Sequence, residues 1–188
     1  GVELAGELAE ELPGLARRHD LDPALARVIL VDAGPTILAG SSPGLIEKGN
    51  AILRELGVEV RTNSLIARAT EDGFVLKSGE TIRGGVFVWA GGIKAPELVS
   101  GSGLPVGNNG RVKVDQYLRV LDQPEIYVAG DLASVTNPAT GRVYAPTAQI
   151  ALSEGETVAN NLLAELDGGP LETFAYSDRG FVVSVGPR

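Results

Sequence analysis

Residues 27–32 read Arg-Val-Ile-Leu-Val-Asp, and this stretch decides the fold class. Its four consecutive apolar residues are typical of a short strand covered on both faces, as in a parallel sheet. A helix is predicted before it at residues 2–16, because apolar residues recur there at helical spacing. A second helix at 45–56 and a strand at 58–61 follow it. This alternation of helix and strand predicts an α/β nucleotide-binding fold.

The chain changes its pattern near residue 64. Short alternating stretches at 65–69, 74–77 and 81–83 are separated by Glu-Asp-Gly and Ser-Gly, which are hairpin signals of an antiparallel meander. The elements predicted after the meander are buried strands at 86–89, 112–114 and 126–131, a helix at 147–166, and one or two strands in the tail at 174–186. Trp89, which ends the first of these strands, is expected to pack in the core.

Composition narrows the class of protein. Of the 188 residues, 44% are hydrophobic and 21% are charged, which excludes a disordered chain. No apolar run reaches the ~18 residues that a membrane span needs. The 16 basic and 24 acidic residues give a net charge of −8, which argues against a nucleic-acid partner. The absence of Cys excludes disulfides, thiol nucleophiles and thiolate metal sites, and the single His excludes a site with several His ligands, so no metal is predicted.

Two residues of the first half are candidates for dinucleotide binding. A dinucleotide fingerprint places three glycines between a strand and a helix, and Gly1 matches only the last of them. A helix with a small residue at a packing point is the alternative. Asp32 stands at the carboxyl end of the first strand, where a carboxylate accepts hydrogen bonds from a ribose 2′-hydroxyl and repels a 2′-phosphate. It predicts NADH rather than NADPH, unless it only caps the next turn.

The second half holds two further candidate motifs. Gly130 and Asp131 end a predicted strand, and a carboxylate in that position can bind the polyol hydroxyls of a dinucleotide. An ordinary loop is the alternative. Ala148 and Gln149 open the last helix, whose free N–H groups and positive dipole end stabilise negative charge on a ligand. A structural helix cap has the same sequence pattern, so the argument depends on the combination of motifs.

Six stretches occur in the order in which one known family carries them. They are Gly-Val-Glu-Leu-Ala-Gly-Glu-Leu at 1–8, Val-Asp-Ala-Gly at 31–34, Val-Trp-Ala-Gly-Gly-Ile-Lys-Ala at 88–95, Tyr-Val-Ala-Gly-Asp at 127–131, Ala-Pro-Thr-Ala-Gln at 145–149 and Phe-Ala-Tyr-Ser-Asp-Arg-Gly at 174–180. Together they resemble type II NADH dehydrogenases, non-proton-pumping NADH:quinone oxidoreductases of the FAD/NAD-dependent pyridine nucleotide-disulfide oxidoreductase superfamily. The resemblance covers essentially the whole chain. It implies an FAD-bound enzyme that takes hydride from NADH and passes electrons to a membrane quinone.

The resemblance also implies a fold and a domain plan. The fold is a two-dinucleotide-binding, Rossmann-like flavoprotein fold with an antiparallel meander, truncated at both ends. Residues 1–90 correspond to most of the NADH-binding domain, without its first strand and part of its glycine-rich loop. Residues 91–188 correspond to the C-terminal half of the FAD-binding domain. The absence of Met leaves two alternatives, an initiator removed ahead of Gly1 or a piece of a longer protein.

A membrane location is implied for the full-length protein only. Family members carry an amphipathic anchor after the part that matches this chain, which places them at the cytoplasmic face of the membrane. The opening residues are neither a basic leader nor an apolar signal core, so nothing suggests export. The fragment itself is expected to be soluble and inactive on its own, and a homodimer is left open.

Two residues gain a catalytic role from the resemblance. Glu3 matches an acidic residue close to the nicotinamide and flavin rings, although a solvated Glu at a helix start is the alternative. Gln149 matches a residue near the quinone head group. One turn further on, where family members often carry another polar or aromatic contact, this chain departs from the pattern with Leu-Ser-Glu at 152–154.

The remaining matches concern the two cofactors, FAD and NADH. Gly91 and Gly92 match the crossing between the domains, where the lack of a Cβ lets the backbone approach the nicotinamide. Asp131, preceded by Gly130, matches the residue that holds the ribityl-phosphate region of FAD. Ala148, together with Gln149, matches the helix start that faces the pyrimidine end of the flavin, where donors favour hydride acceptance.

Two rival functions stay open at this point. One is a soluble FAD-dependent reductase of a ferredoxin or rubredoxin. The other, from a different class, is a nucleotide-binding or interaction module without chemistry. Disulfide and sulfide:quinone reductases depend on cysteine pairs, which this chain lacks. His19 is expected to be a solvated residue just past the first helix.

Overall fold

The computed structural model describes residues 1–177, 180 and 182–186. It divides into two compact units, of which unit 1 comprises Gly1–Gly91 with the end of the tail and unit 2 comprises Gly92–Gly180. The tail at 182–186 therefore belongs to unit 1. The resemblance instead implies a place for it with the rest of residues 91–188, in the C-terminal half of an FAD-binding domain. The reason is local: Val185 packs into the core of unit 1. The assignment of the units to NADH and FAD stays a prediction.

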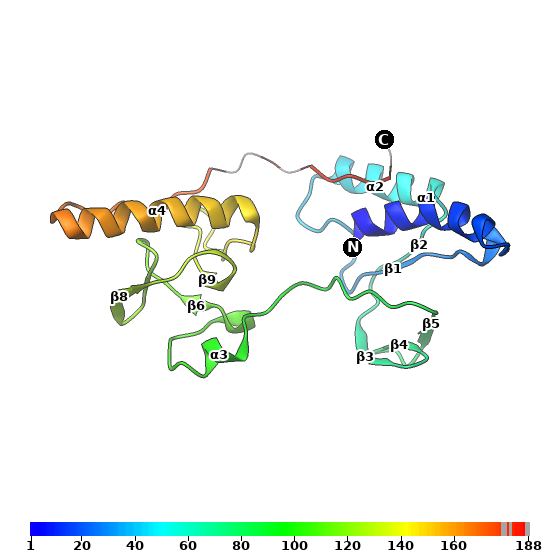
Figure 1. Cartoon of the computed structure of the whole chain (residues 1–188), viewed down its shortest axis with the longest axis horizontal. Helices are drawn as coiled ribbons and strands as arrows, with labels where there is room; N and C mark the ends of the chain where they lie inside the picture. Colours follow the sequence, from blue (N-terminus) through cyan, green and yellow to red (C-terminus); the bar gives the residue numbers. More distant parts are fainter. Residues whose placement is uncertain (178–179, 181, 187–188) are drawn as a thin grey trace. The chain divides into compact units, whose positions relative to one another are not determined.

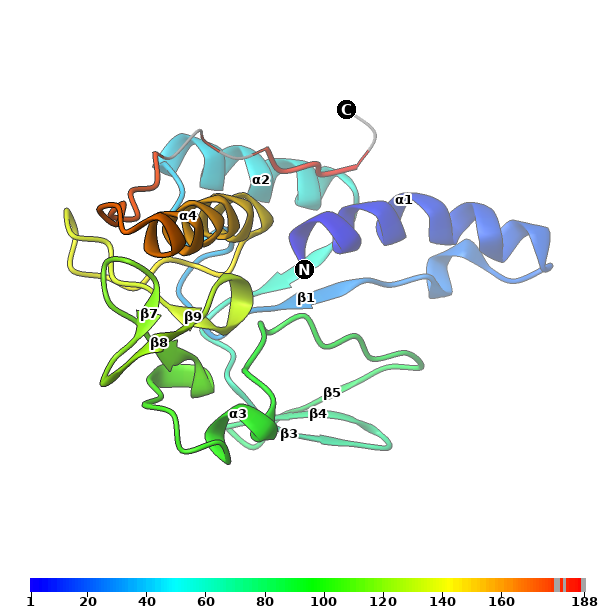
Figure 2. The ribbon, with the colours of Figure 1, turned by 60° about the vertical axis from the view of Figure 1, so that its left-hand side comes forward.

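Unit 1 is built around a parallel pair of strands, β1 (Ile29–Val31) and β2 (Glu59–Arg61). The connection between them contains α2 (Pro43–Glu55), which begins with the favourable signals of a Ser cap and a Pro at the first helical position. α1 (Val2–Arg18) precedes β1. Both helices lie on one side of the strand pair (Figures 1 and 2). The predicted order of helices and strands is confirmed.

The core of unit 1 gathers apolar side chains from both helices, the strand region and the tail. Ile37 and Leu53 are fully buried, and Ala5, Val58 and Val185 complete the cluster. The residues of β1 are only half-buried, so the prediction of a strand covered on both faces is wrong for the described chain. Among the described residues β1 pairs with a single strand, and one side of a two-stranded pair cannot be shielded as in a larger sheet.

The predicted meander is confirmed. β3 (Ile66–Thr70), β4 (Gly73–Leu76) and β5 (Thr81–Arg83) form an antiparallel sheet in that order. It lies on the side of the β1–β2 pair away from the helices (Figures 1 and 2). Gly73 is required at its turn, because a Cβ there would collide with the carbonyl oxygen of Ile82.

The strand predicted at residues 86–89 is wrong, and so is the core position of Trp89. The stretch has no strand assignment, and Val86 and Trp89 are 85% and 65% exposed. The ring of Trp89 meets Phe74 edge-on, with 6.4 Å between the ring centroids. An apolar run becomes a strand only where a neighbour takes its backbone hydrogen bonds. No strand among the described residues pairs with this one.

Unit 2 combines short strands with one long helix, α4 (Ala148–Asp167). The other elements are α3 (Glu97–Ser100), β6 (Val112–Lys113), β7 (Arg119–Val120), β8 (Gln123–Tyr127) and β9 (Ala133–Ser134), with 3-10 turns at η2 (Asn108–Gly110) and η3 (Gly130–Leu132); unit 1 holds a third, η1 (Pro23–Leu25). β6 and β9 pair in parallel, and β7 and β8 pair antiparallel. The core is formed by Leu118, Ala133, Val135, Ile150 and Phe174.

Two predictions for unit 2 need correction. The strand expected at 126–131 ends already at Tyr127, because Gly130 takes a left-handed conformation (φ 71°) and opens η3. The tail at 174–186 forms no strand in its described part, and residues 178–179 and 181 lie outside the described residues. The last helix is confirmed, beginning on Thr147, whose side chain accepts from the Ile150 N–H, and ending at left-handed Gly168.

Candidate functional site

Gly1 lies where the first helix approaches the first strand. It is the cap residue of α1, and a Cβ built on it would come within 3.5 Å of Leu30 Cδ1 and 4.0 Å of Ala90 Cβ. These distances are ordinary van der Waals contacts, so the helix start lies directly against β1. This is the packing role of the last glycine in a dinucleotide fingerprint. The contact of Gly1 with a ligand stays a prediction.

Asp32 follows β1 directly and is fixed on three sides. Its N–H donates to the Arg61 carbonyl at 2.8 Å, and its carbonyl accepts from the Ser64 N–H at 2.9 Å. Its carboxylate oxygen Oδ1 accepts from the Gly34 N–H at 2.7 Å. Asp32 therefore caps the next turn through Oδ1, as the alternative interpretation expects. The other, Oδ2, makes no hydrogen bond within the described residues and can accept one from a ribose hydroxyl.

Glu3 has a partner that sequence reasoning missed. Its exposed carboxylate accepts a hydrogen bond from the Ser184 N–H at 3.1 Å, across 181 positions of sequence. The tail also lies against α1 at Gly6, where an added Cβ would stand 2.8 Å from the backbone nitrogen of Gly186. In unit 1, Glu3 is thus a tether for the tail. No local pattern signals a contact over this sequence separation.

Gly91 and Gly92 stand at the border of the two units, as the resemblance implies. A Cβ at Gly91 would come within 2.7 Å of the Trp89 ring. Gly92 has a φ of 96°, a left-handed conformation that glycine adopts at no steric cost. The backbone therefore favours glycine at Gly92, and a Cβ at Gly91 would require the exposed Trp89 ring to move. An approach of either residue to a nicotinamide stays a prediction.

In unit 2, Gly130 is held between its turn and α4. Its N–H donates to Glu154 Oε2 at 2.5 Å, and a Cβ on it would come within 3.6 Å of the Ala151 methyl group. Asp131, the next residue, is exposed. Its carboxylate makes no hydrogen bond to the described residues. The turn therefore presents the Asp131 carboxylate to solvent, where a ligand hydroxyl can reach it.

Glu154 is the functional candidate that sequence reasoning missed. It is fully buried, and burial raises the pKa of its carboxyl to about 7, although the Gly130 hydrogen bond and the charge of Arg111 act to lower that pKa. A signal was present in the sequence. Glu154 lies at helical spacing between Ile150 and Asn161, which share the buried face of α4.

Gln149 contacts an aromatic cluster at the start of α4. The Tyr176 hydroxyl donates to Gln149 Oε1 at 2.8 Å. Tyr144 meets both Phe174 and Tyr176 edge-on, with ring centroids 5.8 Å and 6.0 Å apart. The N–H groups of Ala148 and Gln149 have no partner among the described residues, so the helix start is free to donate to an anionic ligand.

The predicted residues thus form two groups, one in each unit. In unit 1, Gly1 and Asp32 flank β1. In unit 2, the Gly130–Asp131 turn packs on α4 about one helical turn from Gln149. The convergence of both groups on one cleft stays a prediction.

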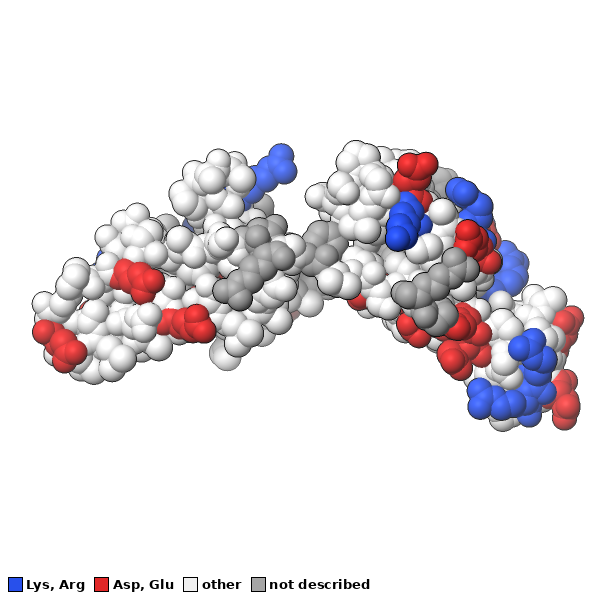
Figure 3. Space-filling model, turned by 90° about the horizontal axis from the view of Figure 1, so that it is seen from above, with Lys and Arg blue, Asp and Glu red and all other residues white. Residues whose placement is uncertain are grey.

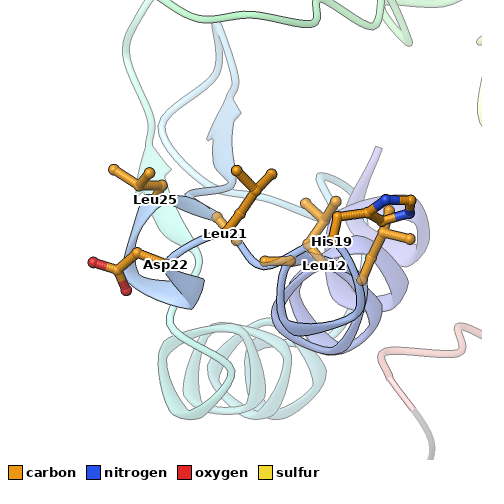
Figure 4. A pocket seen from close by; sticks show the side chains of 8 residues that line it. Leu12, His19, Leu21, Asp22 and Leu25 are labelled. Atoms are coloured by element: carbon orange, nitrogen blue, oxygen red, sulfur yellow. The ribbon is translucent and has the colours of Figure 1, made fainter.

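Two further surface features are largely apolar. A shallow apolar hollow of ≈ 260 Å³ lies at the end of α1, and Figure 4 shows its lining by Leu12, His19, Leu21, Asp22 and Leu25. Its single His is exposed, as predicted. The second surface is the side of unit 2 on which α4 lies, which carries few charges (Figure 3). Leu152 and Leu166 of that helix are 71% and 84% exposed.

Two features are absent from the described residues. No helix within 1–177, 180 and 182–186 combines the length and the hydropathy needed to cross a membrane. The same residues contain no group of three or more His, Cys, Asp or Glu side chains arranged to hold a metal ion.

Comparison with known proteins supplies a family and several structural relatives. Residues 1–155 match the family model of pyridine nucleotide-disulphide oxidoreductases. A type II NADH:quinone oxidoreductase of Staphylococcus aureus (strain NCTC 8325 / PS 47) is 34% identical over 99% of this chain and 47% of its own length. The chain therefore spans about half the length of the curated relatives that it matches.

The solved structures agree on the fold. NDH2 from Plasmodium falciparum in complex with NADH covers 99% of this chain and 54% of its own at a TM-score of 0.83 and 16% identity. An NAD-dependent persulfide reductase from A. fulgidus covers 85% of this chain and 30% of its own, with a TM-score of 0.67 and 25% sequence identity. A ferredoxin reductase from Rhodopseudomonas palustris covers 88% of this chain and 40% of its own, with a TM-score of 0.63 and 22% sequence identity. The predicted fold class, a Rossmann-like α/β flavoprotein fold, is confirmed.

Proposed function

The chain belongs to the pyridine nucleotide-disulphide oxidoreductase family, and we propose that its full-length gene product is an FAD-dependent NADH:quinone oxidoreductase. One observation carries this proposal, the 34% identity over 99% of the chain to a type II NADH:quinone oxidoreductase. The activity is assigned to the full-length product because the chain spans about half of that relative.

NADH is the proposed ligand of unit 1. The α1 start, packed against β1 through Gly1, offers a helix N-terminus for the pyrophosphate. Asp32 offers Oδ2 to the ribose while Gly34 holds its other oxygen in place. A 2′-phosphate would meet this carboxylate as a like charge, so the site favours NADH over NADPH. Glu3, Gly91 and Gly92 stay candidates for the nicotinamide end.

FAD is the proposed ligand of unit 2, and the residues present fit it. Bound FAD supplies the hydride acceptor and passes electrons on. The exposed carboxylate of Asp131 accepts hydrogen bonds from ligand hydroxyls. The free N–H groups of Ala148 and Gln149, at the positive end of α4, favour negative charge at the flavin ring.

The proposed electron acceptor is a quinone near Gln149. The Tyr176 hydroxyl holds the side-chain oxygen of Gln149, which leaves the amide N–H groups to donate to a carbonyl of the acceptor. A peripheral position at the cytoplasmic face of the membrane, through an anchor outside this chain, and a homodimer are proposed for the full-length protein only.

The test uses the full-length gene product, purified with FAD. NADH oxidation is followed at 340 nm with a soluble quinone analogue, and separately with a reducible ferredoxin. Reduction of the quinone and not of the ferredoxin is the expected result. Activity with ferredoxin alone would replace the proposal by the soluble reductase. A protein that binds neither FAD nor NADH in calorimetry would indicate a module without chemistry.

A further inference from the structure

The carboxylate of Glu154 lies beneath the Gly130–Asp131 turn. The side chain is 0% exposed, and its Oε2 accepts from the Gly130 N–H at 2.5 Å. Gly130 adopts a left-handed backbone (φ 71°), so its N–H has no place in the ladder of β8. Without Glu154 this N–H would have no partner among the described residues and would face the buried side of α4. A buried donor without an acceptor is costly, and Glu154 removes that cost.

A buried cation stands near the same carboxylate. Arg111 is 8% exposed, and its Nη1 donates to the Tyr144 carbonyl at 3.0 Å. Its charge acts on Glu154 and favours the ionised carboxylate, whereas the charge of Asp131 opposes ionisation. Glu154 Oε1 and Arg111 Nε are both buried without a hydrogen-bond partner in the described chain. The charges around Glu154 are therefore few and of opposite effect.

Within the described residues, no other hydrogen bond joins the turn to α4. Ala151 contacts Gly130 only through its methyl group, since a Cβ on Gly130 would stand 3.6 Å from it. The direction in which Asp131 leaves the turn thus depends on the backbone of Gly130. That backbone is fastened to α4 by one polar contact, the carboxylate of Glu154.

From this geometry we infer that Glu154 is a positioning residue, which holds the Gly130–Asp131 turn so that the Asp131 carboxylate meets a ligand hydroxyl. The inference rests on the proposed role of Asp131 in binding FAD. Glu154 itself is buried beneath the turn and does not touch the ligand. It acts through the backbone of Gly130, and the charge of Arg111 favours its ionised form.

The variant Glu154→Leu removes the acceptor while it keeps a side chain of similar bulk. In the full-length protein, we expect it to raise the dissociation constant for FAD about tenfold or more, as for loss of a charge-assisted hydrogen bond. In the 188-residue chain, we expect the Gly130 amide to exchange with deuterium about tenfold faster or more, because its N–H no longer has an acceptor. Amide exchange is measured by NMR.

Glu154→Gln is the rescue variant. Its side-chain oxygen can still accept from the Gly130 N–H, so FAD binding and Gly130 exchange should stay within about threefold of the wild type. A role limited to filling space would not separate the Leu and Gln variants in this way. Glu156→Leu is the matched control, since it makes the same change at an exposed position of the same helix.

The wild type provides a further readout that needs no variant. Burial raises the pKa of the Glu154 carboxyl to about 7, so ionisation of this buried carboxyl disfavours the closed turn. Gly130 exchange, corrected for its intrinsic pH dependence, should therefore become faster as the pH rises through 7. Arg111 and Asp131 are the charged groups that act on it. Glu154→Gln should abolish this pH effect.

The outcomes separate the inference from the proposed function. Faster Gly130 exchange and weaker FAD binding in the Leu variant, with rescue by Gln, support both. Unchanged Gly130 exchange in the Leu variant overturns the inference, whether or not FAD binds. A wild type that binds no FAD overturns the proposed function, and the exchange data then still decide whether Glu154 holds the turn. If the Leu variant does not fold, the pH dependence decides: a pH effect on Gly130 exchange that persists unaltered in the Gln variant refutes the inference.

Discussion

Replacing Asn161 by Ala should destabilise unit 2 more than any other exchange of an uncharged polar side chain on α4. Asn161 is fully buried, and its amide makes three hydrogen bonds. Its Nδ2 donates to the carbonyls of Tyr117 at 3.1 Å and Glu172 at 2.9 Å, and its Oδ1 accepts from the Glu172 N–H at 2.6 Å. One side chain thus joins the helix to two separate loops.

The magnitude follows from the groups left behind. Each hydrogen bond contributes roughly 0.5 to 1.5 kcal/mol net, so three bonds give about 1.5 to 4.5 kcal/mol of unfolding free energy. Domains of this size are stable by about 5 to 15 kcal/mol, so the loss is a large part of the total. The neighbouring Asn160 is exposed and bonds only the Glu172 side chain, so Asn160→Ala should cost about 0.5 kcal/mol or less.

Urea unfolding measures the effect, with an internal reference. All four Tyr residues lie in unit 2 and the single Trp lies in unit 1, so near-ultraviolet circular dichroism and Trp fluorescence report the units separately. The Asn161 variant should shift the Tyr transition and leave the Trp transition in place. A loss below about 1 kcal/mol, or one no larger than that of Asn160→Ala, would refute the hydrogen-bond reasoning.

Three further predictions concern pH, backbone and cofactor choice. Because burial raises the pKa of Glu154 to about 7 from 4.5, the folded chain binds this proton more tightly, and the stability it adds is fully present below pH 4.5 and lost as the pH rises through 7. The loss amounts to about 3 kcal/mol of unfolding free energy. It is measured as the difference in unfolding free energy between the wild type and Glu154→Gln over this pH range. Equal slopes of unfolding free energy against pH in the two proteins would contradict it. Gly73→Ala should destabilise unit 1 by roughly 2 kcal/mol or more, because the added Cβ collides with Ile82. The control Gly44→Ala lies in α2 with open space around it and should be neutral or stabilising. Both are measured by Trp-monitored unfolding, and equal effects would exclude the clash with Ile82. Asp32→Ala in the full-length protein should reduce the preference for NADH over NADPH in steady-state kinetics, and an unchanged preference would count against the ribose role.

Local patterns were sufficient for the helices and the meander. The helix at 2–18 carries a continuous apolar face, and the meander is punctuated by turn residues that leave few alternatives. The strand predicted at 86–89 is wrong, because an apolar run does not by itself identify a partner strand. The place of the tail at 182–186 in unit 1 was not predicted for a similar reason, since Glu3 and Gly6, which it contacts, lie at the opposite end of the sequence. Long-range pairing is not encoded in any short window.

Sequence reasoning proposed ligand-binding residues for the candidate site but not the residue that supports them. Asp32, Asp131 and Gln149 were proposed because acidic and amide side chains at strand ends and helix starts have a known chemistry, and their contacts with ligands stay predictions. Glu154 was not, because a Glu within a helix usually faces solvent. Its burial depends on the Gly130 turn, which the sequence places 24 positions away. The supporting groups of a site thus depend on tertiary structure more than its exposed ones.

The buried face of α4 shows how this helix organises unit 2. Two of its fully buried side chains, Glu154 and Asn161, are polar, and both bond backbone groups of loops rather than other side chains. Apolar residues at those positions would bury as much surface, but they would leave the loop N–H and carbonyl groups without partners. The Glu172 segment that Asn161 holds leads within four residues to Tyr176, the partner of Gln149, and the turn that Glu154 holds carries Asp131. The polar residues of this face therefore stabilise unit 2 and also place both ends of the candidate flavin site.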